Sequence, residues 1–267
     1  MKRSFFTSLS ALVIAASPLS AQIIVDSGNL STFAGEIDSM SAQTLSHTVA
    51  AGSNQVLVVT YGARNADANL ASISFNGDSL TNARFEVIDI NSGISAAGVW
   101  YLPNPDVGTF DISYTMSDDD DDGVVVNAFT LSGVDTSNPL GQTGADSGVQ
   151  PGSNQPVDMS VSLTGLSTDS LLITSAAGGW QGTLTPTNVD SELFNGLGKN
   201  VIAAAGTTSV DSASETIDYS FLPGFPSDTQ RSAMVTTEFL AIPEPSSVAL
   251  LIGSLGLFFL GRRRRHS

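Results

Sequence analysis

Most of the chain consists of short apolar or alternating segments separated by turn residues, with little of the 3.6-residue periodicity of an amphipathic helix. Residues 55–61 form a continuous apolar run that suits a central strand, and residues 110–114 alternate cleanly between apolar and polar side chains. Asn76 and Gly77 follow residues 73–75, and an Asn-Gly pair after a strand is a strong signal for a β-hairpin. This pattern predicts an all-β body.

The strands and turns together predict an antiparallel β-sandwich of jelly-roll type. We expect residues 124–131 to be the neighbour of the strand at residues 110–114. Residues 132–156 are rich in Gly, Ser, Asn, Asp and Pro, which predicts a long loop. Residues 178–199 show no clear pattern, and no internal repeat of fixed period is visible. The remaining predicted strands are 85–90, 96–102, 157–163, 171–176, 201–207, 217–221 and 234–240.

The N-terminal segment has the features of a secretory signal peptide. Lys2 and Arg3 precede a mostly apolar run at residues 5–16, and residues 17–21 form a small-residue exit. The predicted cleavage lies between Ala21 and Gln22, after passage through the secretion translocon. The chain then divides into a signal peptide (1–21), an exported β-sandwich domain (22–242) and a C-terminal segment (243–267).

The C-terminal segment has three parts in a fixed order. They are the tripeptide Pro243-Glu244-Pro245, an uncharged and strongly apolar run at residues 248–260, and the four arginines Arg262, Arg263, Arg264 and Arg265. A helix that crosses a bilayer needs about 20 apolar residues, so this short transmembrane helix requires its arginines to snorkel. The positive-inside rule predicts that the arginines stay in the cytoplasm and that the residues before Pro243 lie on the other side.

This order of tripeptide, short apolar span and arginine cluster resembles the PEP-CTERM sorting signal of exported proteins in Gram-negative bacteria. The resemblance implies cleavage near Pro243, Glu244 and Pro245 by an exosortase, a membrane enzyme similar to a transpeptidase. It implies an inner-membrane intermediate with the body in the periplasm, followed by the cell surface or the extracellular matrix of a biofilm, and an association with exopolysaccharide. The segments 99–105, 108–109 and 129–135 resemble a β-sandwich module of secreted bacterial proteins that has no single activity.

Charge limits the partners of the body. Residues 22–242 hold 25 of the 26 acidic residues and four of the ten basic residues, which gives a net charge of −21 (4 minus 25). Such a surface repels nucleic acid and anionic membrane, since both bind through cationic contacts. The acidity is explained equally well by a saline habitat and by weak association with divalent cations.

The composition also removes several classes of enzyme. The chain has no cysteine, and the body has one histidine, His47. A Ser-His-Asp triad would have to use His47, and no Gly-x-Ser-x-Gly motif supports one. His47 alternates with Leu45 and Val49, which predicts a structural histidine on the apolar face of a strand. No catalytic residue is predicted.

Two candidate binding sites stand out. Residues 118–122 are five consecutive aspartates, and Asp118, Asp120 and Asp122 could hold calcium, the single cofactor considered. The alternative is a solvated turn whose like charges block edge pairing, since the run lacks the EF-hand pattern. Trp180 follows two glycines in a predicted loop and is the candidate for stacking on a glycan, whereas Trp100 in an apolar strand is expected in the core.

Two functions remain open at this point. One is a non-catalytic structural or adhesive component of the surface or matrix that is associated with exopolysaccharide. The other is a polysaccharide-active hydrolase or lyase on a jelly-roll scaffold. A glycosidase needs two carboxylates at a defined separation, and the sequence singles out no pair.

Overall fold

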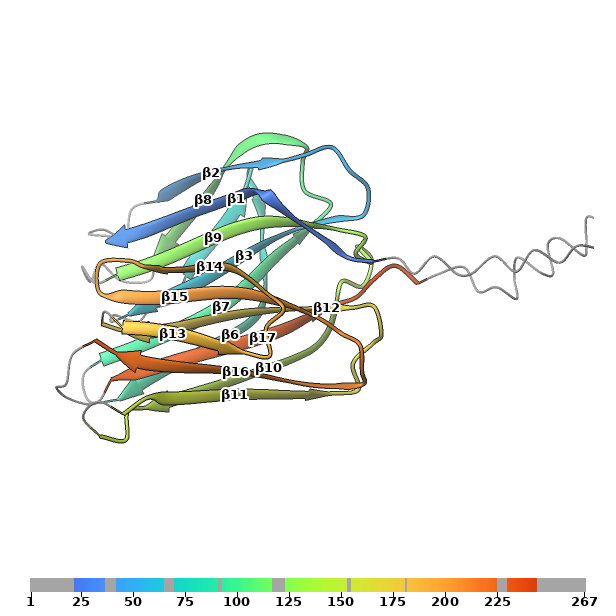
Figure 1. Ribbon diagram of the computed structural model, residues 1–267. Helices are drawn as coiled ribbons and strands as arrows, with labels where there is room; N and C mark the ends of the chain where they lie inside the picture. The colour runs from blue at the N-terminus through green and yellow to red at the C-terminus, as the bar shows by residue number, and fades with distance from the viewer. Residues whose placement is uncertain are drawn as a thin grey trace, which may run out of the picture. The chain divides into compact units, whose positions relative to one another are not determined.

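The computed structural model describes residues 22–36, 42–64, 70–90, 93–116, 123–152, 155–180, 182–224 and 230–243. These residues fall within one compact unit and form seventeen β-strands in four antiparallel sheets (Figure 1). The predicted all-β class is confirmed. The predicted signal peptide and apolar tail lie outside the described residues, and no helix within these residues is long and apolar enough to cross a membrane.

The first half of the body forms two sheets that pack face to face. The first inner sheet has the strand order β1-β9-β3-β7-β6, and the first outer sheet has the order β2-β8-β4-β5. Leu57 and Tyr61 of β3 pack against Phe75 of β4 and Ile112 of β8 between these sheets. The strands are β1 Ile24–Glu36, β2 Gln43–Val49, β3 Gln55–Arg64, β4 Leu70–Phe75, β5 Asp78–Ser79, β6 Thr81–Ile90, β7 Gly93–Pro103, β8 Gly108–Met116 and β9 Gly123–Ser132.

The second half repeats this arrangement. Its inner sheet has the order β10-β17-β12-β15-β14, and its outer sheet has the order β11-β16-β13. Met159, Leu172, Ile217 and Phe221 are buried between the two. The strands are β10 Leu140–Val149, β11 Val157–Thr164, β12 Leu171–Gly179, β13 Gly182–Thr187, β14 Ser191–Leu197, β15 Val201–Ser209, β16 Ser214–Pro223 and β17 Arg231–Phe239.

The two halves share one strand order although the sequence shows no repeat of fixed period. If β10 to β13 are matched to β1 to β4, and β14 to β17 to β6 to β9, the orders of the inner sheets coincide, and so do those of the outer sheets apart from the short β5. In each half the last strand lies between the first and third strands, so β9 pairs with β1 and β3, and β17 pairs with β10 and β12. The duplication is therefore one of topology.

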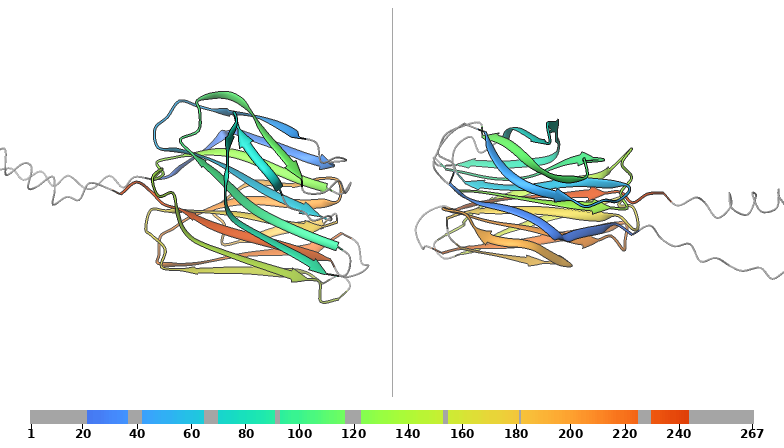
Figure 2. Two further views of the ribbon diagram at one scale, coloured as in Figure 1. Left: turned by 180° about the vertical axis from the view of Figure 1, so that it is seen from behind. Right: turned by 90° about the horizontal axis from the view of Figure 1, so that it is seen from above.

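The two inner sheets pack against each other, and we call this contact the seam (Figure 2). Val58 of β3 and Val99 of β7 contribute to the same buried cluster as Ile173 of β12 and Val235 of β17. The backbones approach closely at Gly62, where a Cβ atom would lie 2.7 Å from the Cβ of Ala203. Small side chains at this point let two twisted sheets meet without a gap.

The predicted long loop at residues 132–156 is wrong, because it contains β10. This strand pairs along its length with β17 at the edge of the second inner sheet. Its glycines give it the composition of a loop, but they have a packing role. A Cβ atom at Gly144 would lie 2.6 Å from Cγ1 of Val161, and one at Gly148 would lie 2.6 Å from Cγ1 of Val157.

The predicted pairing of residues 110–114 with residues 124–131 is also wrong. Strand β8 lies in the first outer sheet between β2 and β4, whereas β9 lies in the first inner sheet. The chain crosses from one sheet to the other between these strands. The hairpin at Asn76 and Gly77 is confirmed, since Phe75 pairs with Asp78 and the two turn residues have φ values of 49° and 92°.

The strand directions give the body two distinct ends. The carbonyl of Gly133 accepts a hydrogen bond from the backbone N–H of Ile242 at 3.1 Å, and Gly133 also lies against the backbone of Gln22. Both ends of the described chain therefore meet at the connector between the halves, and we call this end the exit pole. Strands β3, β12, β14 and β16 finish at the opposite end, the far pole (Figures 1 and 2).

Candidate functional site

Trp180 lies at the far pole, directly after β12. Its backbone N–H donates a hydrogen bond of 2.7 Å to the carbonyl of Asn200, which holds it beside the turn between β14 and β15. Its φ is 60°, a conformation that costs a bulky residue about 1–3 kcal/mol. The residue is 39% exposed. The fold thus holds a large aromatic ring at the surface in a strained conformation, which is a feature typical of functional sites.

Arg64 fixes the position of this ring from the other half of the body. The guanidinium carbon of Arg64, at the end of β3, lies 4.1 Å from the centroid of the Trp180 ring, which makes a cation–π contact. Arg64 is only 8% exposed. A Cβ atom at Gly179 would lie 3.2 Å from Cδ of Arg64, so a glycine keeps the path of the arginine open. Arg64 therefore covers one face of the indole and closes that face to a ligand.

Two glutamines lie beside this pair. The backbone N–H of Gln150 donates to the carbonyl of Gln230 at 2.7 Å, and Oε1 of Gln230 lies 3.5 Å from the Cβ position of Gly179. The side-chain amide of Gln150 is buried, and neither of its polar atoms has a partner in the described part of the chain. An aromatic ring, a guanidinium and the buried amide of Gln230 therefore lie together at the far pole, whereas the sequence singled out Trp180 alone.

The predicted calcium ligands Asp118, Asp120 and Asp122 lie outside the described residues. Where the chain is described again, the Cβ position of Gly123 lies 2.8 Å from the backbone nitrogen of Asn200. Strand β9 therefore begins next to the backbone that holds Trp180. Across the described ranges, no group of three or more His, Cys, Asp or Glu side chains could hold a metal ion.

The four basic residues of the body all lie at or beside the seam. Sequence reasoning predicted no role for them, because charge composition does not reveal which partner a side chain meets. In the structure they tie one half to the other or support a residue that does. Their partners are the Trp180 ring for Arg64, Glu86 for Arg84, Glu36 for Lys199 and the carbonyl of Ile90 for Arg231.

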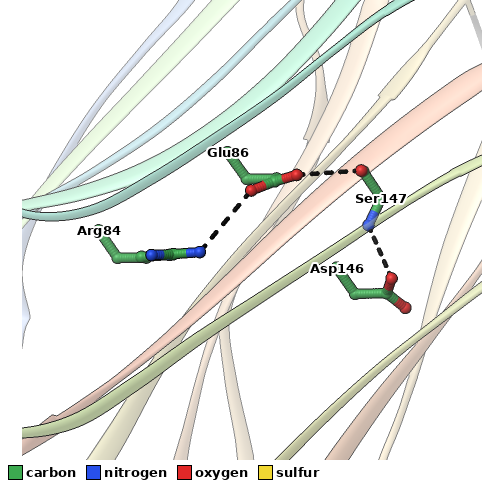
Figure 3. A network of polar contacts seen from close by, with 4 residues as sticks. All are labelled: Arg84, Glu86, Asp146 and Ser147. Atoms are coloured by element: carbon green, nitrogen blue, oxygen red, sulfur yellow. Dashed lines mark hydrogen bonds and ion pairs between the residues drawn. The ribbon is translucent and has the colours of Figure 1, made fainter.

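Glu86 and Asp146 are the carboxylates that the fold brings to one residue, Ser147 (Figure 3). Ser147 Oγ donates to Glu86 Oε1 at 3.1 Å, and its backbone N–H donates to Asp146 Oδ1 at 2.9 Å. Arg84 Nη2 lies 3.9 Å from Glu86 Oε2, and the backbone N–H of Ser160 donates to Asp146 Oδ2 at 2.8 Å. Both carboxylates thus connect β6, β10 and β11, which is a structural role.

The C-terminal residues settle how the chain is sorted. Strand β17 ends at Phe239, Ala241 forms an isolated bridge with Val134, and the family model of the PEP-CTERM protein-sorting motif matches residues 241–265. The tail is a PEP-CTERM sorting motif. The resemblance predicted from the sequence is confirmed, and the motif implies export and processing by an exosortase. No curated protein and no solved structure matches the chain.

The PEP-CTERM motif begins where the folded body ends. Ala241 and Ile242 contact the connector between the halves, and Pro243 is the last described residue. The other predicted processing residues, Glu244, Pro245 and Arg262 to Arg265, lie outside the described residues. All seventeen described strands precede Pro243, so a cut near this tripeptide would leave every one of them in the processed protein.

The single histidine in the body, which precedes the PEP-CTERM motif, is structural, as predicted. His47 is buried on the same face of β2 as Val49. Its Nδ1 lies 3.1 Å from Ser31 Oγ, and its Nε2 lies 3.3 Å from Thr130 Oγ1. The imidazole is therefore held between two hydroxyl groups and joins β2 to the first inner sheet.

The environment of His47 predicts a pH dependence of folding. Burial lowers the pKa of His47, and the opposing effect of Asp26 is smaller. In the unfolded chain the imidazole titrates near about pH 6.5. As the pH falls through that value the unfolded chain binds the proton more readily, so stability falls. Denaturation at a series of pH values should show that His47→Gln removes part of this loss. Equal pH slopes for variant and wild type would contradict the prediction.

Proposed function

We propose that the protein is a non-catalytic component of the cell surface or extracellular matrix that binds polysaccharide through Trp180. The observation that carries the proposal is an exposed indole held by a buried arginine at the far pole. An aromatic face stacks well on the apolar face of a sugar ring. PEP-CTERM sorting supports delivery to the exterior, where such a polymer lies.

The architecture supports the same function. We assign each half to the jelly-roll type, because the order β1-β9-β3-β7 over β2-β8-β4 is repeated as β10-β17-β12-β15 over β11-β16-β13. Jelly rolls include lectin domains. The assignment rests on strand order, and the function rests on Trp180.

The path to the surface follows from the two ends of the chain. We propose removal of residues 1–21 after the translocon, an inner-membrane intermediate held by the tail, and cleavage near Glu244 by the exosortase. The fold starts directly after the proposed first cut, since Gln22 is exposed and Ile23 is buried. The body is residues 22–242, with the exit pole at the junction with the tail.

The alternative is a polysaccharide hydrolase or lyase. It would require two carboxylates placed on either side of a bound sugar. The pair that the fold brings to Ser147, Glu86 and Asp146, is occupied by bonds that connect strands. This arrangement favours the non-catalytic function.

Replacing Trp180 with Ala should weaken binding to the exopolysaccharide of the bacterium that makes the protein. A lost aromatic contact of about 1 kcal/mol corresponds to roughly fivefold in affinity per site. Val107→Ala is the matched control, because Val107 is 54% exposed just before β8, in the half of the body that does not hold Trp180. Affinity measured by titration calorimetry, together with an assay for new reducing ends, tests the proposal. Release of product by the wild type would support the hydrolase instead.

A further inference from the structure

We infer that the Trp180 site takes an uncharged polysaccharide and discriminates against acidic ones. This inference rests on the proposed function and specifies its ligand class. It follows from the charge of the body and from the positions of the four basic side chains. Neither observation is needed for glycan binding as such, so the two ideas can fail separately.

The negative charge of the body repels an anionic polysaccharide. Residues 22–242 carry a net charge of −21, so a chain of uronate or sulfated sugars meets repulsion as it approaches. Charges within about 8 Å of each other still interact at physiological ionic strength. Binding of a polyanion would therefore require cations at the site that outweigh this repulsion.

The four basic side chains of the body already make contacts within the protein. A sugar carboxylate is recognised best by a guanidinium that offers it two parallel N–H groups. Arg64 lies under the indole and is almost fully buried, and Arg231 is 9% exposed and donates to the carbonyl of Ile90. Arg84 and Lys199 are more exposed, but each is paired with a glutamate. Drawing any of them toward a ligand would break a contact at or beside the seam.

The groups that remain around Trp180 suit a neutral sugar. Gln230 places its amide oxygen 3.5 Å from the Cβ position of Gly179, and an amide carries no net charge. The exposed part of the indole offers contact area for the C–H groups of a pyranose. A neutral sugar can use this contact, whereas a carboxylate adds repulsion from the acidic body.

The test compares neutral glucan and mannan oligosaccharides with oligouronates of equal length, at low and high salt, on the full-length protein in detergent. A chelator is present, so that no divalent cation bridges carboxylates. We expect the neutral oligosaccharides to bind with an affinity that salt does not change and that Trp180→Ala reduces about fivefold. Oligouronates should bind more weakly, and their binding should rise with salt as repulsion is screened.

The possible failures are distinguishable. If oligouronates bind more tightly, lose affinity at high salt and depend on Trp180, the inference on charge is wrong and the proposed function stands. If neither class binds in a Trp180-dependent way, the proposed function fails, and the inference fails with it. Trp180→Phe keeps an aromatic face and should retain part of the affinity, which separates loss of stacking from misfolding.

Discussion

We expect deletion of Arg262 to Arg265 to leave the protein in the membrane as an unprocessed precursor. The four arginines follow an apolar run that is short for a bilayer crossing, and the positive-inside rule predicts that they set the orientation of the tail. Without them we expect the tripeptide Pro243-Glu244-Pro245 to be presented poorly to the exosortase. Pulse-chase labelling with fractionation should show precursor in membranes and no mature form outside the cell.

Two further variants separate the effect of the positive charge from recognition of the tripeptide sequence. Replacing the four arginines with lysines keeps the positive charge, so processing should continue. Glu244→Gln keeps the charge cluster but alters the tripeptide, and precursor should accumulate. The body is expected to fold in every variant, because Ile242 makes the last hydrogen bond in the described part of the chain, and resistance of the body to protease checks this. Mature protein at normal yield after the arginine deletion would refute the sorting mechanism.

Replacing Gly62 with Val strongly destabilises the body by forcing the two halves apart. A Cβ atom at Gly62 would lie 2.7 Å from the Cβ of Ala203 and 3.0 Å from that of Ala177. These neighbours are short side chains fixed on strands β12 and β15, so they cannot move aside without shifting a sheet. Overpacking of this kind costs about 1–3 kcal/mol, and occasionally more. Urea denaturation should show the loss as a lower midpoint.

A glycine outside the seam provides the matched control. The Cβ position of Gly152 has only Cγ of Gln155 nearby, at 3.9 Å, so Gly152→Val adds the same side chain without a clash. Its stability should remain close to that of the wild type. Gly62→Ala should fall between the two variants. If Gly62→Val and Gly152→Val unfolded at the same urea concentration, the close packing of the seam would not be important for stability.

Local sequence was sufficient for the class of fold and for the sorting of the protein. The alternation of residues 157–163 appears as alternating burial in β11, and the apolar run at 55–61 is buried throughout β3. The Asn76-Gly77 turn and the structural role of His47 were also predicted. Each of these features depends on neighbours along the chain, since strand periodicity and turn geometry are local. The PEP-CTERM motif is a linear signal, so it too can be recognised from the sequence alone.

The partners of each strand and each cation were decided by packing between distant segments. Strand β10 has the composition of a loop, and it is a strand because β17 pairs with it and β11 covers its glycines. The contact of Arg64 with Trp180 joins residues more than a hundred positions apart, on opposite sides of the seam. A local pattern shows which face of a strand is apolar, but the energy of close packing selects the surface that covers it.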